Sequence, residues 1–297
     1  MEITTVGVTG AGQMGGGIAQ VFAQVGLTVH LHDVSEAALQ RAQRGIRQSL
    51  DTLAEKGKLQ GSPDAVISRI HLTTSLDPFQ AAACVVEAAP EQVELKRSIF
   101  TSLDAVTLPS AILASNTSSI AIATLADATR RPAQVIGMHF MNPVPRMPCV
   151  EVIRARATSD ATFAITSALV ARLGKTMVVS QDRAGFIVNR ILMPMINEAA
   201  HAFAEGVATR DDIDTAMKLS CNFPMGPLAL ADFIGLDTVV AILEVMQEGL
   251  AGAHYAPSPL LREYVAKGWT GRKGQRGFYE YASARTPPFR AAKGAIS

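Results

Sequence analysis

A glycine-rich segment near the start of the chain constrains the fold more than any other feature. An apolar run over residues 5–9 stops at Gly10, and Gly12 and Gly15 complete a G-x-G-x-x-G spacing before a helix-like segment. A second apolar run over residues 28–32 ends in Asp33. This is the order that a dinucleotide-binding βαβ unit requires: a strand, a tight turn, a helix, a second strand and an acidic residue. The sequence therefore predicts such a unit.

Each of these residue types has a physical task in binding a dinucleotide. Gly10 permits a tight turn, Gly12 lets the backbone approach a pyrophosphate, and Gly15 lets the helix lie close to the strand. The helix N-terminus offers N–H groups to the phosphates. Asp33 can accept hydrogen bonds from a ribose diol and would repel a 2′-phosphate, which favours NAD over NADP. A glycine-rich turn without a ligand would not explain the complete βαβ context.

Charge, hydropathy and cysteine content exclude several classes of protein. The net charge is +1 and no long run of like charges occurs, so no nucleic-acid partner is expected. No segment has the roughly 18 unbroken apolar residues of a membrane span, and the first strand begins too early for a signal peptide. Cys84, Cys149 and Cys221 lack metal-ligand spacing. We expect a cytoplasmic protein without a metal, with reduced and mostly buried thiols; Cys149, near the candidate site, could be reactive.

The order of apolar segments predicts two domains. Strands are expected at residues 5–9, 28–32, 70–73, 83–88, 111–114, 135–140, 150–153 and 177–179. A long helix capped by Ser35 is expected after the second strand. Beyond Gly185 only helical spacing appears, and residues 283–297 resemble a loose tail. The predicted fold is an α/β Rossmann-type domain over residues 1–183, with that helical insertion, and an all-α domain over residues 184–297.

Two helical segments of the second domain suggest self-association. Residues 187–203 are apolar on more faces than a surface helix needs. Residues 239–250 carry a second apolar stripe, formed by Val239, Ile242, Leu243, Met246 and Leu250. Because a small domain cannot easily hide so much apolar surface, we expect a homodimer formed through this domain.

Polar residues in apolar surroundings are the candidates for chemistry. His139 lies in an expected strand, where a lone histidine is more often structural than catalytic. Glu151 stands between two valines, where an unpaired charge would be costly, and His139 is its nearest strand-borne partner. A carboxylate that holds an imidazole gives a general base. Asn189 interrupts an apolar helix start, and a serine of the segment 115–119 is expected to cap a helix.

Short motifs are distributed over most of the chain in a definite order. They are GAGQMG (10–15), SNTSS (115–119), GMHFMNPVP (137–145), GFIVNR (185–190), DDIDTAM (211–217), PMGPL (224–228) and IGLD (234–237). In this order the chain resembles the L-3-hydroxyacyl-CoA dehydrogenase family, including bacterial 3-hydroxybutyryl-CoA dehydrogenases. The resemblance covers residues 7 to about 281 and is far more specific than the glycine loop alone.

The resemblance implies an NAD-dependent oxidation of L-3-hydroxyacyl-CoA in a cleft between the two domains. His139 would take the 3-hydroxyl proton, Glu151 would orient His139, and Ser118 and Asn189 would hydrogen-bond the substrate. The implied cofactor contacts are Gly10, Gly12, Gln13, Met14, Gly15, Asp33, Glu91, Lys96, Ser118, Asn142 and Lys273. Ser49 and Lys56 match positions that touch CoA, although Lys56 and Lys58 could equally form a solvated helix end.

Departures from the family pattern leave the substrate open. In the loop between His139 and Glu151, Met141, Arg146 and Pro148 replace a usual aromatic, a usual apolar residue and a usual lysine. The departures leave the acyl-chain preference open. We expect a short acyl group, as in 3-hydroxybutyryl-CoA, and the alternative is a terminal carboxylate paired with Arg146, as in 3-hydroxyadipyl-CoA. The chain could also be a dehydrogenase of a free hydroxy or sugar acid, as in lambda-crystallin-like members, or an NAD-binding protein without turnover.

Overall fold

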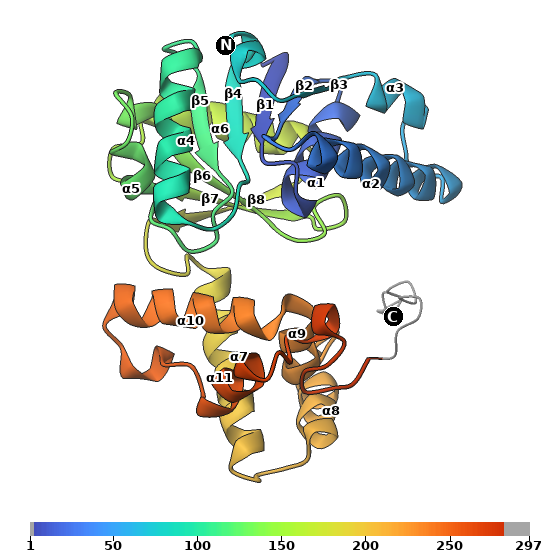
Figure 1. The fold of residues 1–297 in the computed structure, drawn as a ribbon, viewed down its shortest axis with the longest axis vertical. Coiled ribbons are helices and arrows are strands. Elements are labelled where there is room, and N and C mark those ends of the chain that lie inside the picture. The colour runs from blue at the N-terminus through green and yellow to red at the C-terminus, as the bar shows by residue number, and fades with distance from the viewer. Residues whose placement is uncertain (1–2, 282–297) are drawn as a thin grey trace. The chain divides into compact units, whose positions relative to one another are not determined.

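The computed structural model describes residues 3–281. The chain divides into two compact units, Met1–Phe186 and Ile187–Ser297, each with a hydrophobic core of its own (Figure 1). The tail predicted for residues 283–297 lies outside the described residues. Among the residues that are described, no helix is both long and apolar enough to cross a membrane.

The first unit is built on a single eight-stranded sheet with the order β3-β2-β1-β4-β5-β6-β7-β8 (Figure 1). The strands β1 to β6 run parallel, whereas β7 is antiparallel to β6 and parallel to β8. Their bounds are β1 Thr5–Thr9, β2 Thr28–His32, β3 Ile70–Thr73, β4 Cys84–Glu87, β5 Ile112–Ser115, β6 Val135–Phe140, β7 Cys149–Arg154 and β8 Thr176–Gln181.

The reversal between β6 and β7 follows from the length of the loop that joins them. A parallel crossover takes about a dozen residues or more, and residues 141–148 are too few for one. The chain therefore turns back on itself, and β7 pairs with β6 in an antiparallel register that sets His139 opposite Glu151.

The helices of the first unit are α1 Gln13–Gln24, α2 Glu36–Glu55, α3 Pro63–Ile67, α4 Val93–Val106, α5 Ile122–Ala126 and α6 Asp160–Arg172. The pair α2 and α3 forms the predicted insertion after β2, and α2 extends well beyond the sheet edge (Figure 1). Ser35 caps α2 as predicted, since its Oγ accepts a hydrogen bond from the Ala38 amide at 3.3 Å. Leu39, Ile46 and Leu50 are the buried residues that hold one face of α2 against the core.

The expected serine cap of the helix after β5 was wrong. The N-cap of α5 is Ala121, which has no capping side chain. The carboxylate of Asp182 caps α5 instead, because it accepts hydrogen bonds from the amides of Ile122 and Ala123 at 2.8 Å each. A residue far along the chain supplies the cap, so local sequence could not identify it.

The second unit is helical, with α7 Val188–Ala204, α8 Arg210–Ser220, α9 Pro227–Ile234, α10 Leu236–Leu250 and α11 Pro259–Ala266. Val239, Leu243 and Met246 of α10 are fully buried in this unit's own core. These residues of the apolar stripe of α10 are therefore buried by the chain itself and are not available to a partner. On α7, in contrast, Ile191 remains 69% exposed.

Candidate active site

The glycine loop at the end of β1 has space for a ligand at one of its glycines and none at the other two. Gly10 has a φ of +98°, and a Cβ there would lie 2.5 Å from the carbonyl oxygen of Ala88. A Cβ on Gly15 would lie 1.7 Å from the carbonyl oxygen of Gly10. A Cβ on Gly12 would meet nothing within 4 Å. Gly12 is also the N-cap of α1 and brings no capping side chain, so the first amides of this helix suit a pyrophosphate.

Asp33 is held against the glycine loop. Its Oδ2 accepts a hydrogen bond from the Ala11 amide at 2.8 Å, and its Oδ1 accepts one from the Ser35 amide at 2.9 Å. Each carboxylate oxygen can accept more than one hydrogen bond, so the group can also bind a ribose diol. The two backbone contacts fix its position before any cofactor binds.

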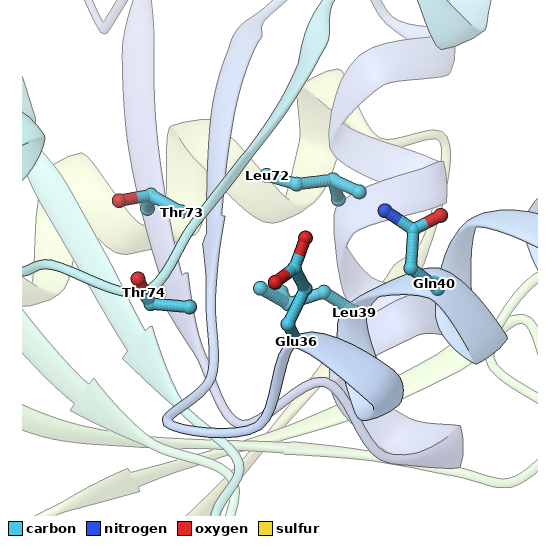
Figure 2. Close-up of a pocket in the computed structure, with 6 residues that line it drawn as sticks. All are labelled: Glu36, Leu39, Gln40, Leu72, Thr73 and Thr74. Atoms are coloured by element: carbon cyan, nitrogen blue, oxygen red, sulfur yellow. The ribbon is translucent and has the colours of Figure 1, made fainter.

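A small cavity of about 200 Å³ lies close to Asp33 and was not anticipated from the sequence. Its walls come from the first turns of α2 and the end of β3, and the carboxylate of Glu36 points into it (Figure 2). The lining residues are Glu36, Leu39, Gln40, Leu72, Thr73 and Thr74. One of these lining residues, Thr73, is in contact with Asp33: its carbonyl oxygen accepts a hydrogen bond from the Asp33 amide at 3.3 Å. Glu36 thus adds a second negative charge on this side of the loop.

These two carboxylates lead to a prediction about cofactor choice. We expect kcat/KM with NADH to exceed that with NADPH, because a 2′-phosphate would meet the charges of Asp33 and Glu36. Steady-state rates with both cofactors test it, and the Asp33→Ser variant should narrow the preference. Equal use of the two cofactors by the unmodified protein would show that Asp33 does not meet the ribose.

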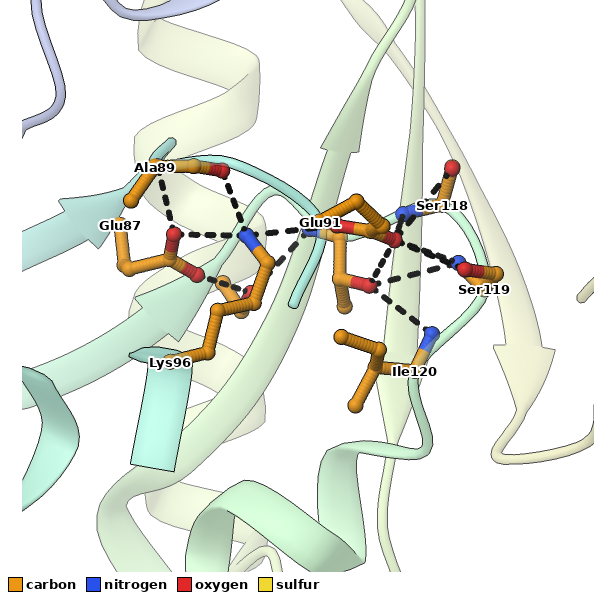
Figure 3. A network of polar contacts seen from close by, with 9 residues as sticks. Glu87, Ala89, Glu91, Lys96, Ser118, Ser119 and Ile120 are labelled. Atoms are coloured by element: carbon orange, nitrogen blue, oxygen red, sulfur yellow. Dashed lines mark hydrogen bonds and ion pairs between the residues drawn. The ribbon is translucent and has the colours of Figure 1, made fainter. Parts of the chain in front are cut away.

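Glu91 is the centre of a polar network at the ends of β4 and β5 (Figure 3). Its Oε1 accepts hydrogen bonds from the hydroxyls of Thr117 and Ser119, at 2.5 and 2.9 Å, and from the amides of Ser118 and Ser119, at 2.9 and 3.1 Å. Burial alone would raise the pKa of Glu91, but the charge of Lys96 and these hydrogen bonds outweigh it and lower the pKa. Glu91 is therefore an anion at neutral pH, and it holds the segment that carries Ser118.

Lys96 contacts Glu91 from the other side and is itself buried. Its side chain is 1% exposed, and its ammonium lies 2.6 Å from Glu87 Oε1 and 3.3 Å from Glu91 Oε2. Glu87 is fully buried at the end of β4. The apolar pattern of residues 83–88 predicted a strand but did not single out Glu87, although a carboxylate in an apolar strand is the same signal that drew attention to Glu151.

His139 and Glu151 form the second polar centre of the first unit. They are opposite each other in the antiparallel β6–β7 pair, and His139 Nδ1 lies 2.7 Å from Glu151 Oε2. The Glu151 side chain is 0% exposed and that of His139 is 10% exposed. The Phe186 ring packs beside the imidazole at a centroid distance of 6.0 Å. A protonated Nδ1 bonded to Glu151 leaves Nε2 as the nitrogen that can take a proton.

Gln13 and Asn142 connect the glycine loop to the loop after β6. The amide of the Gln13 side chain donates to Asn142 Oδ1 at 3.1 Å. Met14, the next residue of α1, is half-buried and packs against the core. The cofactor residues that the resemblance implies in the first unit thus follow the ends of five strands, β1, β2, β4, β5 and β6.

The remaining candidates are on α2 and in the second unit. Ser49 is half-buried on α2, and Lys56 is the exposed C-cap of the same helix. In the second unit, Asn189 is buried in the first turn of α7, and the ammonium of Lys273 donates to Asp237 Oδ2 at 2.7 Å.

The cysteines differ from expectation. Only Cys84 is buried, which raises the pKa of its thiol to about 12, while Cys149 is half-buried and Cys221 exposed. Burial and the charge of Glu151 raise the pKa of Cys149, so the suggested reactivity of this thiol has no support. Among the described residues, no group of three or more histidine, cysteine, aspartate or glutamate side chains could hold a metal ion.

Comparison with known proteins decides the family. The model of the 3-hydroxyacyl-CoA dehydrogenase NAD binding domain matches residues 5–183, and that of the C-terminal domain matches residues 185–281. The chain belongs to the 3-hydroxyacyl-CoA dehydrogenase family. This result confirms the resemblance, the fold class and the expectation of NAD as cofactor.

Individual relatives cover nearly the whole chain. A probable 3-hydroxybutyryl-CoA dehydrogenase of Deinococcus radiodurans is 54% identical over 93% of this chain and 99% of its own length. A 3-hydroxybutyryl-CoA dehydrogenase of Bradyrhizobium diazoefficiens is 52% identical over 97% of this chain and 99% of its own length. The crystal structure of (S)-3-hydroxybutyryl-CoA dehydrogenase from Ralstonia eutropha is similar with a TM-score of 0.91 and 48% identity, over 95% of this chain and all (100%) of that one.

Proposed function

We propose that this protein catalyses the NAD-dependent oxidation of L-3-hydroxyacyl-CoA to 3-ketoacyl-CoA, and the reverse reaction, with a short acyl group such as 3-hydroxybutyryl. The observation that carries the proposal is the buried pair of His139 and Glu151 at 2.7 Å. The names of relatives at 52–54% identity support the acyl group. Residues 1–183 would bind NAD, and residues 184–297 would contribute Asn189 to the substrate site.

In this proposal His139 is the general base. Its Nε2 takes the proton of the 3-hydroxyl group, and Glu151 holds the imidazole and balances the charge that develops on it. NAD bound at the glycine loop would supply the hydride acceptor for C3. Ser118 and Asn189 hydrogen-bond the substrate oxygen, and the amides behind Gly12 bind the pyrophosphate.

The oxidation of NADH with a panel of ketones tests the proposal. We expect rapid turnover with acetoacetyl-CoA and much slower turnover with free acetoacetate. A higher kcat/KM with 3-ketoadipyl-CoA would favour the carboxylate-ended substrate, for which the exposed side chain of Arg146 is available. Turnover of free keto acids at the rate of the thioester would favour a hydroxy-acid dehydrogenase. NADH binding without any turnover would favour a structural role and refute the proposal.

Lys56 tests whether CoA is recognised. In the Lys56→Ala variant we expect the KM for acetoacetyl-CoA to rise about 5- to 30-fold, because an exposed charge-assisted hydrogen bond to phosphate contributes roughly 1–2 kcal/mol. Added salt should shrink the difference, and NADH affinity should stay nearly unchanged. Lys218→Ala, which removes an exposed lysine of α8, is the matched control. An unchanged KM in Lys56→Ala would remove Lys56 from the CoA site.

We also propose that the protein is a cytoplasmic homodimer. The 69% exposed Ile191 of α7 supports an interface on this helix, whereas the buried stripe of α10 does not. Light scattering at micromolar concentration should give twice the mass of one chain. Ile191→Asp should shift the mass toward that of a single chain, and a monomeric unmodified protein would contradict the proposal.

A further inference from the structure

The ammonium of Lys96 is buried among acceptors of the protein itself. It lies 2.6 Å from Glu87 Oε1, 3.0 Å from the carbonyl oxygen of Ala89 and 3.3 Å from Glu91 Oε2 (Figure 3). Two of its three N–H donors form the hydrogen bonds to Glu87 and Ala89, and the contact with Glu91 is an ion pair. With a side chain that is 1% exposed, Lys96 has almost no surface that a dinucleotide could touch.

Glu87 explains how this lysine is accommodated in a buried position. Besides the contact with Lys96, its Oε1 accepts a hydrogen bond from the Ala89 amide at 2.6 Å. Its Oε2 accepts one from the hydroxyl of Ser115 at 2.6 Å. Both oxygens of a fully buried carboxylate are thus paired, which is the condition under which burial of a charge is tolerated. Glu87 thereby joins the end of β4 to the end of β5 and neutralises Lys96.

The other end of the network fixes the backbone on both sides of Ser118. Thr117 is fully buried, and its hydroxyl donates to Glu91 Oε1 while it accepts a hydrogen bond from the Ile120 amide at 2.9 Å. The Ser118 amide donates to the same oxygen of Glu91. Glu91 is in turn held by Lys96, so the position of Ser118 depends on a chain of contacts that begins at Glu87.

We propose that Glu87, Lys96 and Thr117 are positioning residues, which act through Glu91 to set the place of Ser118 in the active site. For Lys96 this role replaces the direct cofactor contact that the family resemblance implies. The inference rests on the proposed function, because it assigns Ser118 a contact with the reacting groups.

A double-mutant cycle distinguishes positioning from direct contact. Thr117→Val removes the hydroxyl at nearly constant volume. Glu87→Gln/Lys96→Met removes both buried charges together, because Lys96→Met alone would leave Glu87 unpaired and could prevent folding. We expect each variant to lower kcat with acetoacetyl-CoA about 10-fold, since a displacement near 1 Å can cost on the order of 100-fold. Because both act through Glu91, the combined variant should lose far less than the product of the two effects.

NADH affinity, measured by fluorescence titration, provides the second readout. Thr117→Val and Glu87→Gln/Lys96→Met both act through Glu91 and Ser118, so they should change the NADH dissociation constant by a similar factor. Thr117→Ser, which keeps the hydroxyl, should keep the kcat of the unmodified protein. Thr107→Val is the matched control, because the Thr107 hydroxyl is buried but bonds only to the carbonyl oxygen of Leu103 within α4; its kcat should be unchanged.

Two results would overturn the inference. One is a combined loss in kcat that equals the product of the separate losses. The other is an NADH dissociation constant that rises about 10-fold more in Glu87→Gln/Lys96→Met than in Thr117→Val, which would establish a direct cofactor contact of Lys96. Failure of the proposed function is distinguishable, because the unmodified protein would then not reduce acetoacetyl-CoA, while NADH affinity would still test Lys96.

Discussion

The His139→Gln variant is expected to reduce acetoacetyl-CoA with a kcat lowered by at least ~100-fold, which is the range for loss of a general acid or base. Glutamine keeps a polar side chain beside Glu151 but cannot exchange a proton at the position of Nε2. NADH affinity should hardly change, because the glycine loop and Asp33 are at other strand ends of the sheet. Stopped-flow or steady-state oxidation of NADH measures the effect.

His71→Gln is the matched control for this experiment. His71 is exposed on β3, and its ring lies beside His30 at a centroid distance of 5.4 Å, away from the β6–β7 pair. Its replacement should leave kcat unchanged. Near-normal turnover by His139→Gln would remove His139 from the mechanism and, with it, the observation on which the proposed function depends.

The second large effect is expected at Gly12. The backbone of Gly12, with φ −71° and ψ −171°, accommodates alanine, and its Cβ would meet no atom of the protein within 4 Å. A methyl group in that space would block the approach of a pyrophosphate. Loss of one charge-assisted hydrogen bond, about 2 kcal/mol, corresponds to a ~30-fold higher NADH dissociation constant. The melting temperature should not change.

Alanine substitutions at two other glycines serve as controls for this result. In Gly15→Ala the new Cβ would collide with the carbonyl of Gly10, so both the melting temperature and NADH affinity should fall. In Gly45→Ala, within α2, the Cβ also meets nothing within 4 Å, and stability should rise slightly while affinity stays constant. If Gly12→Ala binds NADH normally, the pyrophosphate does not lie at this loop.

The sequence predicted those parts of the molecule in which the signal is local or periodic. Short sequence patterns predicted the βαβ unit, the cap at Ser35 and the strands that carry His139 and Glu151. Each of these patterns is local, so contacts made elsewhere in the fold do not alter it. The cap supplied by Asp182 and the hydrogen bonds of Glu91 join residues that are far apart in the chain. The spacing of residues in a sequence does not predict such contacts. Glu87 carries the same signal as Glu151, a carboxylate in an apolar strand, but its partners Lys96 and Ser115 could not be identified from spacing. The stripe of α10 was misjudged because the chain's own core covers it.

The antiparallel pair β6 and β7 holds the positions of His139 and Glu151, whereas part of the loop that joins the two strands can vary in sequence. His139 and Glu151 are cross-strand neighbours, so the register of two buried strands fixes their distance. Asn142 and Val144, early in the joining loop, are tied to Gln13 and packed near Gly17. Residues 146–148 are exposed and carry two of the departures from the family pattern. Under the proposed function, we expect mutation there to change which acyl chain is accepted without disturbing the base, and a library for altering substrate range would begin with these three positions.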